Sequence, residues 1–266
     1  MKKVQIMGIL NLTPDSFYDG DIDRLRNYEL VKKSFDHISD SDIIDVGGES
    51  SRPASKPISF EQEIDRIATI DDIVKKNCNS KIFSIDTYKP KVAEYAIENG
   101  YKMVNDIFAG RYKKGMFELV SNYNIPIVLM HMRGTPVDMQ KYIKYDSLID
   151  NILSFFDERV AEAKKFGILD KNIILDPGIG FAKGALDNYL IIKNIHRIKK
   201  LGYKVLIGLS RKSFLSIENT ISANNRLLES VVMNSISYLN GADILRVHDV
   251  LETRRGINVL RNYIKS

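Results

Sequence analysis

Cysteine is almost absent from this chain of 266 residues, because Cys78 is its only one, so no disulfide can form within the chain. Such cysteine usage is typical of proteins in reducing compartments. The apolar run at the N-terminus, residues 4–10, is far shorter than the roughly 20 residues that span a bilayer, and no small-residue cleavage site follows it. We therefore expect a cytoplasmic protein.

Zinc motifs and clustered basic runs are also missing. The sequence has four histidines and contains neither a Cys/His pair at zinc spacing nor an HExxH motif. Its formal net charge is +5, but the basic residues are scattered and usually alternate with acidic ones. The 13 tyrosines and 11 phenylalanines do not gather beside basic runs. This pattern favours a solvated basic surface over a nucleic-acid interface.

Eight short apolar or β-branched runs are spaced along the chain, and longer helical patterns separate them. They are Val4–Leu10, Asp42–Val46, Lys81–Asp86, Met103–Ile107, Ile127–His131, Ile173–Asp176, Val205–Leu209 and Ile244–His248. Most are almost continuously hydrophobic rather than alternating. This is typical of parallel strands that are covered by helices.

The intervening segments have apolar residues at gaps of three and four, which places them on one helical face. These stripes are Tyr28, Val31, Phe35 and Ile38; Phe60, Ile64, Ile67, Ile70 and Val74; Ile149, Ile152, Phe156, Val160 and Ala163; Leu228, Val232, Ile236 and Leu239; and Ile257, Leu260 and Ile264. Ser59 and Gln62 form a capping-box pattern, and Pro90 stands where a helix would begin. Gly100, Gly167 and Gly241 stand where helices would end.

Eight strand and helix repeats without a linker predict an α/β protein with a (β/α)₈ TIM barrel, in which residues 1–266 form one domain. The alternative is an open doubly wound sheet, which would usually have a glycine-rich turn after its first strand. Here the segment Asn11–Phe17 follows that strand and lacks such a turn. The barrel is therefore favoured.

Unusual polar residues stand at the end of nearly every predicted strand, where barrel enzymes place their chemistry. They are Asn11, Asp45–Pro53, Asp86–Thr87, Asn105–Asp106, Met130–Met132, Asp176–Phe181, Ser210–Ser213 and Arg246–Asp249. One such residue alone would be read as a loop cap. Eight that converge on one barrel mouth predict a ligand site, because buried polar groups are costly unless they have partners.

The charges at this mouth indicate an anionic ligand. Arg52, Lys212 and Arg246 would line it with His248, which suits an anion such as a diphosphate. Asn11 could help to hold a divalent cation, and Mg²⁺ needs few protein ligands when a substrate supplies phosphates. Asn11 could equally cap the following turn.

Deeper acceptors suit a planar ring. Asp86, Asn105 and Asp176 could grip the guanidine-like edge of a pterin or purine, although one aspartate could instead pair with a lysine or arginine. Lys212 and Ser213 are expected to open a short helix through residue 216. Its N-terminal amides would favour a carboxylate.

Several of these segments resemble the signatures of dihydropteroate synthases. The first is Met7–Phe17 and the second Asp45–Pro53, and the later ones are Asp176–Lys183, Ser210–Phe214 and Arg246–His248. The similarity covers essentially the whole chain, with the blocks in order. Ser51 stands where the family more often has threonine, which preserves the hydroxyl group.

The resemblance implies a role for each matching position. Asp86, Asn105, Asp176 and Lys212 match pterin-binding residues, and Met130 and Gly208 match positions near the pterin. Ser51, Arg52, Arg246 and His248 match diphosphate contacts, and Asn11 matches the position linked to magnesium. Pro53, Phe181, Lys212 and Ser213 match the p-aminobenzoate pocket, over which the loop with Thr13, Pro14 and Phe17 would close. Asp86, Lys212, Arg246 and His248 would be the catalytic residues.

The resemblance also implies the reaction, in which (7,8-dihydropterin-6-yl)methyl diphosphate and 4-aminobenzoate give 7,8-dihydropteroate and diphosphate in folate biosynthesis. This is an alkyl transfer, a Mg²⁺ cofactor would assist departure of the diphosphate, and the family is the target of sulfonamides. A homodimer is expected, with small-molecule substrates and no nucleic-acid or membrane partner.

Two other functions compete with this interpretation. The methyltetrahydrofolate-binding half of corrinoid methyltransferases would share the pterin site, but it has no use for a diphosphate clamp or for a carboxylate site at residues 210–213. A non-catalytic pterin or phosphate binder would have lost one or more site residues. Asn11, Arg52, Asp86, Lys212 and His248 are all present, which favours the enzyme.

Overall fold

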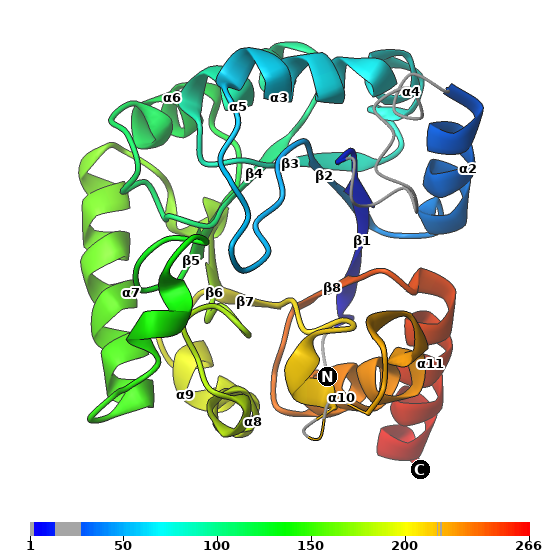
Figure 1. The fold of residues 1–266 in the computed structure, drawn as a ribbon, viewed down its shortest axis with the longest axis vertical. Coiled ribbons are helices and arrows are strands. Elements are labelled where there is room, and N and C mark those ends of the chain that lie inside the picture. The colour runs from blue at the N-terminus through cyan, green and yellow to red at the C-terminus, as the bar shows by residue number, and fades with distance from the viewer. Residues whose placement is uncertain (1–2, 14–27, 217, 219) are drawn as a thin grey trace.

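The chain folds into a closed barrel of eight parallel strands, as the sequence predicts. The computed structural model describes residues 3–13, 28–216, 218 and 220–266. The strands are β1 (Gln5–Asn11), β2 (Ile43–Gly47), β3 (Ile82–Asp86), β4 (Met103–Asp106), β5 (Ile127–Met130), β6 (Ile173–Asp176), β7 (Lys204–Ile207) and β8 (Ile244–Val247). Each pairs with the next along the chain, and β8 pairs with β1 to close the barrel (Figure 1).

Helices surround the strands, as Figure 1 shows. They are α2 (Tyr28–Ile38), α3 (Phe60–Ile67), α4 (Asp71–Asn77), α5 (Pro90–Glu98), α6 (Met116–Tyr123), α7 (Leu148–Lys165), α8 (Ala185–Lys193), α9 (Ile195–Lys199), α10 (Leu227–Leu239) and α11 (Val250–Lys265). Short 3₁₀ turns are η2 (Ala68–Ile70), η3 (Met139–Tyr142), η4 (Asp170–Asn172), η5 (Ser213–Leu215) and η6 (Ala223–Asn225). Within the described ranges, no helix is both long and apolar enough to cross a membrane.

The helix ends that depend on local sequence agree with the prediction. At the start of α3, the Ser59 hydroxyl accepts from the Gln62 amide at 3.2 Å, and the Gln62 side chain accepts from the Ser59 amide at 3.1 Å. Pro90 is the first residue of α5, where its missing N–H costs nothing. The stripe from Phe60 to Val74 is not one helix, however, because η2 separates α3 from α4.

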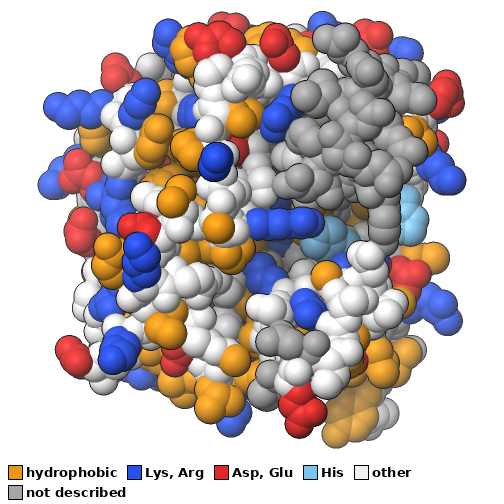
Figure 2. All heavy atoms as spheres, viewed as in Figure 1, with side chains coloured by type: hydrophobic (Ala, Val, Ile, Leu, Met, Phe, Trp, Pro, Cys, Tyr) orange, Lys and Arg blue, Asp and Glu red, His pale blue; other side chains and the backbone are white. Residues whose placement is uncertain are grey.

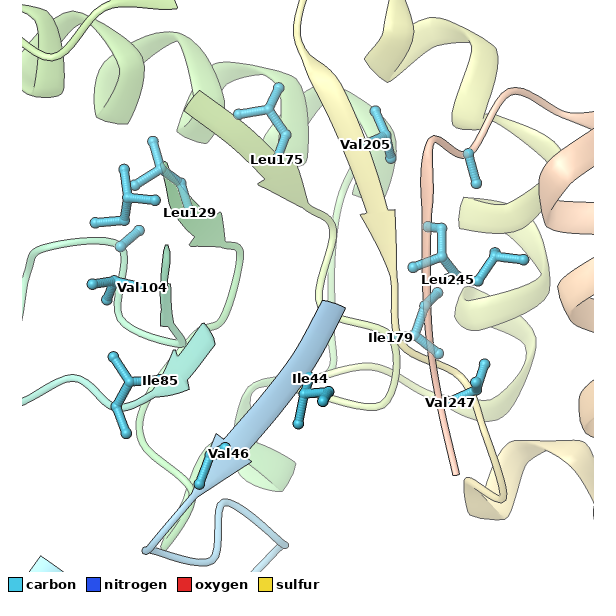
Figure 3. Close-up of a cluster of buried hydrophobic side chains, with 14 of the residues drawn as sticks. Ile44, Val46, Ile85, Val104, Leu129, Leu175, Ile179, Val205, Leu245 and Val247 are labelled. Carbon is cyan, nitrogen blue, oxygen red and sulfur yellow. The ribbon is translucent and has the colours of Figure 1, made fainter. Parts of the chain in front are cut away.

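The two faces of the strands carry different side chains. The outward residues, among them Ile44, Val46, Ile85, Leu245 and Val247, pack beneath the helices in a large apolar cluster (Figure 3). A second, separate cluster consists of Met7, Ile43, Met103, Val128, Ile174, Leu206 and Ile244. These alternate with the outward residues and therefore fill the inside of the barrel. We call this second cluster the barrel plug.

Helix α10 differs from the other helices with an apolar stripe in the face that it buries. Its apolar stripe faces solvent: Leu228 is 70% exposed, and Val232, Ile236 and Leu239 are 38–48% exposed. Its buried side carries Ser230, Asn234, Ser237 and Tyr238 instead. Periodicity therefore identified one face of this helix correctly but not the direction in which that face points.

Candidate active site

The candidate site lies directly above the barrel plug, because side chains two residues apart on a strand point to the same side. On six strands, the plug residue is followed two positions later by a residue of the candidate site. Five of these six were predicted from the sequence, and the sixth, Asp45, begins the predicted segment Asp45–Pro53. These pairs are Ile43 and Asp45, Met103 and Asn105, Val128 and Met130, Ile174 and Asp176, Leu206 and Gly208, and Ile244 and Arg246. The sequence thus places an apolar floor beneath a polar layer.

Arg246 is the centre of this polar layer. Its Nε donates to Asp45 Oδ2 and its Nη2 to Asp86 Oδ2, both at 2.6 Å. The Asp45 side chain is fully buried, and that of Arg246 is 19% exposed. The arginine therefore joins β8 to β2 and β3 across the interior. This confirms that one predicted acceptor pairs with a cation, the alternative left open for the aspartates.

The charges in this group set the pKa of each member. Burial raises the pKa of Asp86 to about 7; Arg246 opposes the shift and the carboxylate of Asp45 adds to it. Burial alone would lower the pKa of Arg246, but Asp45 and Asp86 raise it above its usual value. Arg246 is therefore permanently charged, whereas Asp86 can exchange a proton near neutral pH.

Asp45 begins the predicted polar segment Asp45–Pro53, where the sequence indicates no role for it, and the structure shows that it holds two site residues. Besides Arg246, it accepts from Asn105 Nδ2 at 2.9 Å. A carboxylate can only accept here, so this bond fixes which way the Asn105 amide points. The Asp45 Oδ1 atom is buried without a hydrogen-bond partner among the described residues. The two-residue spacing from Ile43 could have revealed Asp45.

Lys212 reaches the site from the loop after β7. Its ammonium group lies 4.5 Å from the centre of the Phe181 ring and donates to the Ile179 carbonyl oxygen. Burial lowers its pKa to about 8, against the opposing effect of Asp176. It therefore remains protonated at pH 7. The short helix predicted through residue 216 is the 3₁₀ turn η5, which Lys212 precedes and Ser216 follows. With three residues it is too short to present a helix dipole.

The loop after β6 is held by buried contacts that the sequence did not indicate. Asp176 Oδ1 accepts from the Gly178 amide at 2.7 Å. Lys183 Nζ lies 2.8 Å from the Phe181 carbonyl oxygen, 3.3 Å from that of His131 and 3.0 Å from His131 Nδ1. Burial lowers the pKa of Lys183 to about 7 and that of His131, with help from Lys183, to about 2. These contacts fix the position of Phe181.

At the end of β8, His248 Nδ1 lies 3.1 Å from Ser210 Oγ. Burial, together with Arg246 and Arg211, lowers the pKa of His248 to about 4, so the ring is neutral at pH 7. It can thus donate a hydrogen bond to an anion but does not supply a full charge. Next to it, Asp249 accepts two hydrogen bonds from Arg211, at 3.0 and 2.5 Å. This pair joins the loops after β7 and β8.

The loop between β2 and α3 carries Ser51, Arg52 and Pro53 and lies over the barrel in Figure 1. Arg52 and Pro53 are exposed, whereas Ser51 is partly buried. The loop extends to the far side of the mouth, because the Ala54 amide donates to the Pro136 carbonyl oxygen at 2.9 Å. Figure 2 shows Lys or Arg side chains and a histidine gathered near the middle of this face. The predicted cationic mouth is consistent with this view.

Asn11 ends β1 and lies across from Gly47, its partner in the sheet. A Cβ atom on Gly47 would lie 3.5 Å from Asn11 Oδ1 and 3.7 Å from Asp86 Oδ2, so these two oxygens flank the same position. No group of three or more His, Cys, Asp or Glu side chains in the described ranges could hold a metal. One amide oxygen fits a Mg²⁺ ion that takes its other ligands from phosphate and water.

The remaining predicted residues are distributed as follows. Met130 is buried with Tyr88, Phe108 and Ala182 in an apolar cluster against which Phe181 packs. A Cβ on Gly208 would lie 3.7 Å from two carbons of Arg246, so the glycine leaves space beside that side chain. Ser213 is exposed at the start of η5. Thr13 is buried, and the predicted lid residues Pro14 and Phe17 lie outside the described residues.

Comparison with known proteins gives consistent results. Residues 7–248 match the family of pterin binding enzymes. The dihydropteroate synthase of Clostridium beijerinckii is 42% identical over 96% of this chain and 92% of its own length. A Yersinia pestis dihydropteroate synthase in a sulfonamide drug complex superposes with a TM-score of 0.92 at 31% identity, covering 99% of this chain and 95% of that one.

A third relative was solved with 4-aminobenzoic acid. The dihydropteroate synthase of Xanthomonas albilineans with 4-aminobenzoic acid has a TM-score of 0.88 and 32% identity, covering 100% of this chain and 94% of that one. The closed eight-stranded barrel agrees with these matches. The chain therefore belongs to the pterin-binding enzymes and, among them, to the dihydropteroate synthase family of transferases.

Proposed function

We propose that this protein condenses (7,8-dihydropterin-6-yl)methyl diphosphate with 4-aminobenzoate to form 7,8-dihydropteroate and diphosphate. The observation that carries the proposal is the polar layer built around Arg246, with Asp45, Asp86 and Asn105 on an apolar floor. Such a layer offers hydrogen bonds to a planar polar ring. Family membership and the relatives named above support the choice of substrates.

The pterin is proposed to lie on the floor of the barrel. Asp176 and Asn105 would bind its polar edge, and Lys212 would bind from above. Two of these groups are preorganised, because Asn105 is held by Asp45 and Asp176 by the Gly178 amide. Met130 and Gly208 would contact its flat face. A preorganised polar edge beside an apolar wall is typical of a small-molecule site.

The diphosphate is proposed to lie at the mouth, between the β2–α3 loop and the end of β8. Ser51, Arg52, Arg246 and His248 would contact it. The neutral ring of His248 would donate a hydrogen bond, and an adjacent anion would raise its pKa. Mg²⁺ bound through Asn11 would neutralise negative charge on the leaving diphosphate.

The 4-aminobenzoate is proposed to lie nearer the surface, between the β6 and β7 loops. The Phe181 ring and Pro53 would contact its aromatic ring, and Lys212 with Ser213 would bind its carboxylate. The Lys212 ammonium already lies over the Phe181 ring at 4.5 Å, so the cation and the aromatic wall of this pocket adjoin. Lys212 thus stands between the two substrates.

Asp86 is proposed to stabilise the reaction electrostatically. The C–O bond between the pterin methylene and the diphosphate would break first, and the positive charge that develops on the pterin would be delocalised into its ring. This charge would lower the pKa of Asp86 below its resting value of about 7 and favour the carboxylate. The aniline nitrogen would then attack the methylene carbon without a strong general base. The proton that it loses would pass to the diphosphate already split off, which would then be released.

A coupled assay tests this proposal. Purified protein would be mixed with the pterin diphosphate, 4-aminobenzoate and Mg²⁺, and dihydropteroate and released diphosphate would be followed together. We expect the two products in equal amounts, with none formed if 4-aminobenzoate is omitted. Pterin binding without either product would refute the synthase and support a non-catalytic pterin binder.

We also propose that the protein is a homodimer formed through α10. The stripe of Leu228, Val232, Ile236 and Leu239 is exposed although the opposite side of the helix is buried. A row of this kind on one helix can pack against the same row of a second copy about a two-fold axis. Because this stripe lies on the outside of the barrel, the copy would cover apolar surface without blocking the mouth.

Light scattering after size-exclusion chromatography tests the dimer. Val232→Glu combined with Leu228→Glu should give a monomer, whereas Leu169→Glu, at a residue that is 50% exposed before η4, should leave the dimer intact. A wild-type monomer at micromolar concentration would refute the interface. The cytoplasmic location expected from the sequence remains a prediction that fractionation of cells would test.

A further inference from the structure

Glu49 joins the two ends of the β2–α3 loop, which contains Ser51 and Arg52, two of the proposed diphosphate contacts. It stands two residues after Gly47, the last residue of β2, and its carboxylate reaches the other end of the loop. Its Oε2 atom accepts from the backbone amide of Ile58 at 2.9 Å. Residues 49 and 58 are thereby joined, and Ser51, Arg52 and Pro53 lie within the closed segment.

The same carboxylate is anchored to the barrel. Its Oε2 atom also accepts from Lys89 Nζ at 2.6 Å, and its Oε1 atom accepts from the Tyr88 hydroxyl at 2.5 Å. Both partners come from the turn between β3 and α5, directly after Asp86 and Thr87. The Glu49 side chain is only 9% exposed. All three hydrogen bonds are therefore largely shielded from water, which strengthens them.

Lys89 is shared with a second buried carboxylate. Its Nζ atom donates to Glu63 Oε2 on α3 at 2.6 Å, and the Glu63 side chain is almost completely buried. Burial raises the pKa of Glu63, and Lys89 opposes that shift. One ammonium group thus links the β2–α3 loop, helix α3 and the β3–α5 turn. Without Glu49, Lys89 would still have Glu63 as a partner.

Within the closed segment, the described residues make few other contacts that fix the backbone. The Ser55 amide donates to the Arg52 carbonyl oxygen at 3.1 Å, and the Ala54 amide reaches Pro136. The Arg52 amide lies 3.4 Å from Ser50 Oγ, a long and weak bond. Most side chains from residue 52 to residue 57 are exposed. The loop is therefore held mainly at its ends rather than by packing.

We propose that Glu49 is a positioning residue that holds Ser51 and Arg52 in place for the pterin diphosphate. This inference rests on the proposed function for its substrate, but the closure itself does not. The carboxylate oxygens of Glu49 accept from the Ile58 amide, Tyr88 and Lys89, so Glu49 acts through the backbone of the loop. Its loss should weaken binding of the diphosphate group more than binding of the pterin ring.

The test compares Glu49→Ala with Glu49→Gln. Alanine removes all three hydrogen bonds. Glutamine can restore them, because its oxygen can accept from Ile58 and Lys89 and its NH₂ group can donate to the Tyr88 hydroxyl. Asp243→Ala is the matched control, since Asp243 likewise accepts from a lysine, Lys199 at 2.6 Å, and from a backbone amide, that of Val205 at 2.7 Å. Asp243 lies at the opposite end of the barrel, before β8.

Hydrogen exchange followed by mass spectrometry gives the first readout, and it needs no activity. Amides of residues 50–58 should exchange at least about tenfold faster in Glu49→Ala than in the wild type, with Glu49→Gln close to the wild type. The KM for the pterin diphosphate and the inhibition constant of inorganic diphosphate should each rise about tenfold in the alanine variant, with kcat changed less than about threefold. Binding of the pterin alcohol that lacks the diphosphate should be unchanged.

Each result decides a separate point. Exchange at the wild-type rate in Glu49→Ala would overturn the closure. Faster exchange with unchanged diphosphate inhibition would overturn its link to substrate binding. If Asp243→Ala raised the KM as much as Glu49→Ala, general loss of stability would explain the effect and the inference would be wrong. If the wild-type protein made no dihydropteroate, the proposed function would fail while the exchange experiment still tested the closure.

Discussion

Replacing Asp45 with asparagine should show how much the site depends on a residue that is proposed to touch no substrate. At an effective dielectric constant of about 20, opposite charges about 4 Å apart attract by roughly 4 kcal/mol. Asparagine removes this attraction for Arg246 but still offers an oxygen acceptor, and Asp86 remains as a partner at 2.6 Å. We therefore expect a loss of about 2–3 kcal/mol in the free energy of unfolding. For a chain of this size, the melting temperature should fall by about 5–10 °C.

The same substitution should change the pH dependence of the reaction. Burial, with the charge of Asp45 adding to it, raises the pKa of Asp86 to about 7 in the wild type. Because the ionised form of Asp86 is proposed to be the active one, kcat/KM should fall as the pH decreases through about 7. In Asp45→Asn the pKa of Asp86 is lower, so this fall should occur at a lower pH.

Thermal unfolding and a pH–rate profile measure the two effects. The control is Asp150→Asn, which breaks a surface ion pair with Arg197 whose side chains are 61% and 42% exposed. Because this pair is solvated, that change should leave the melting temperature nearly unchanged. Equal melting temperatures for the two variants, together with an unshifted acid limb, would show that Asp45 does not support Arg246 as described.

Four further substitutions, one of them with a matched control, address other parts of the site. Asp86→Asn should leave the fold intact and lower kcat at least about 100-fold, and unchanged turnover would remove Asp86 from the mechanism. Lys212→Ala should raise the KM of both substrates, and an effect on neither would contradict its place between the pockets. Gly178→Ala should lower the free energy of unfolding by at least about 3 kcal/mol, because its Cβ would lie 2.1 Å from the His131 carbonyl oxygen at a φ of +69°. Its control is Gly202→Ala, also at positive φ but with open space around it, which should lower the free energy of unfolding by only about 1 kcal/mol. Asn11→Ala should raise the Mg²⁺ concentration needed for half-maximal rate about tenfold without altering pterin binding in its absence, and an unchanged titration would assign the ion to other ligands.

The parts of the fold that depend on local pattern could be predicted from the sequence. Apolar runs indicated all eight strands, and the Ser59 capping box and Pro90 indicated where helices begin. The exposed stripe of α10 could not be anticipated, because periodicity shows that one face is apolar but not what covers it. The break between α3 and α4 was missed for a related reason, since the stripe continues through η2 without a proline or glycine.

The candidate site divides in a similar way. Side chains at strand ends, such as Asp176 and Arg246, were found because the barrel topology requires their convergence. Their supporting partners were not found, because pairs such as Glu49 with Lys89 join residues 40 positions apart in the chain. Neither residue type nor spacing indicates such a pair. Only the folded structure showed which charges compensate one another.

The barrel plug has a consequence for the order of events during turnover. Because Met7, Ile43, Ile174 and the other plug residues fill the interior below the polar layer, the proposed cavity is open only at the mouth. On the proposed placement, the pterin lies at the closed inner end of this cavity and the 4-aminobenzoate lies near the mouth. The deeper substrate must then arrive first, and the finished product can leave only through the route by which both substrates came in. On this placement, kinetics with a compulsory order would follow from seven apolar side chains that would touch neither the diphosphate nor the aniline nitrogen.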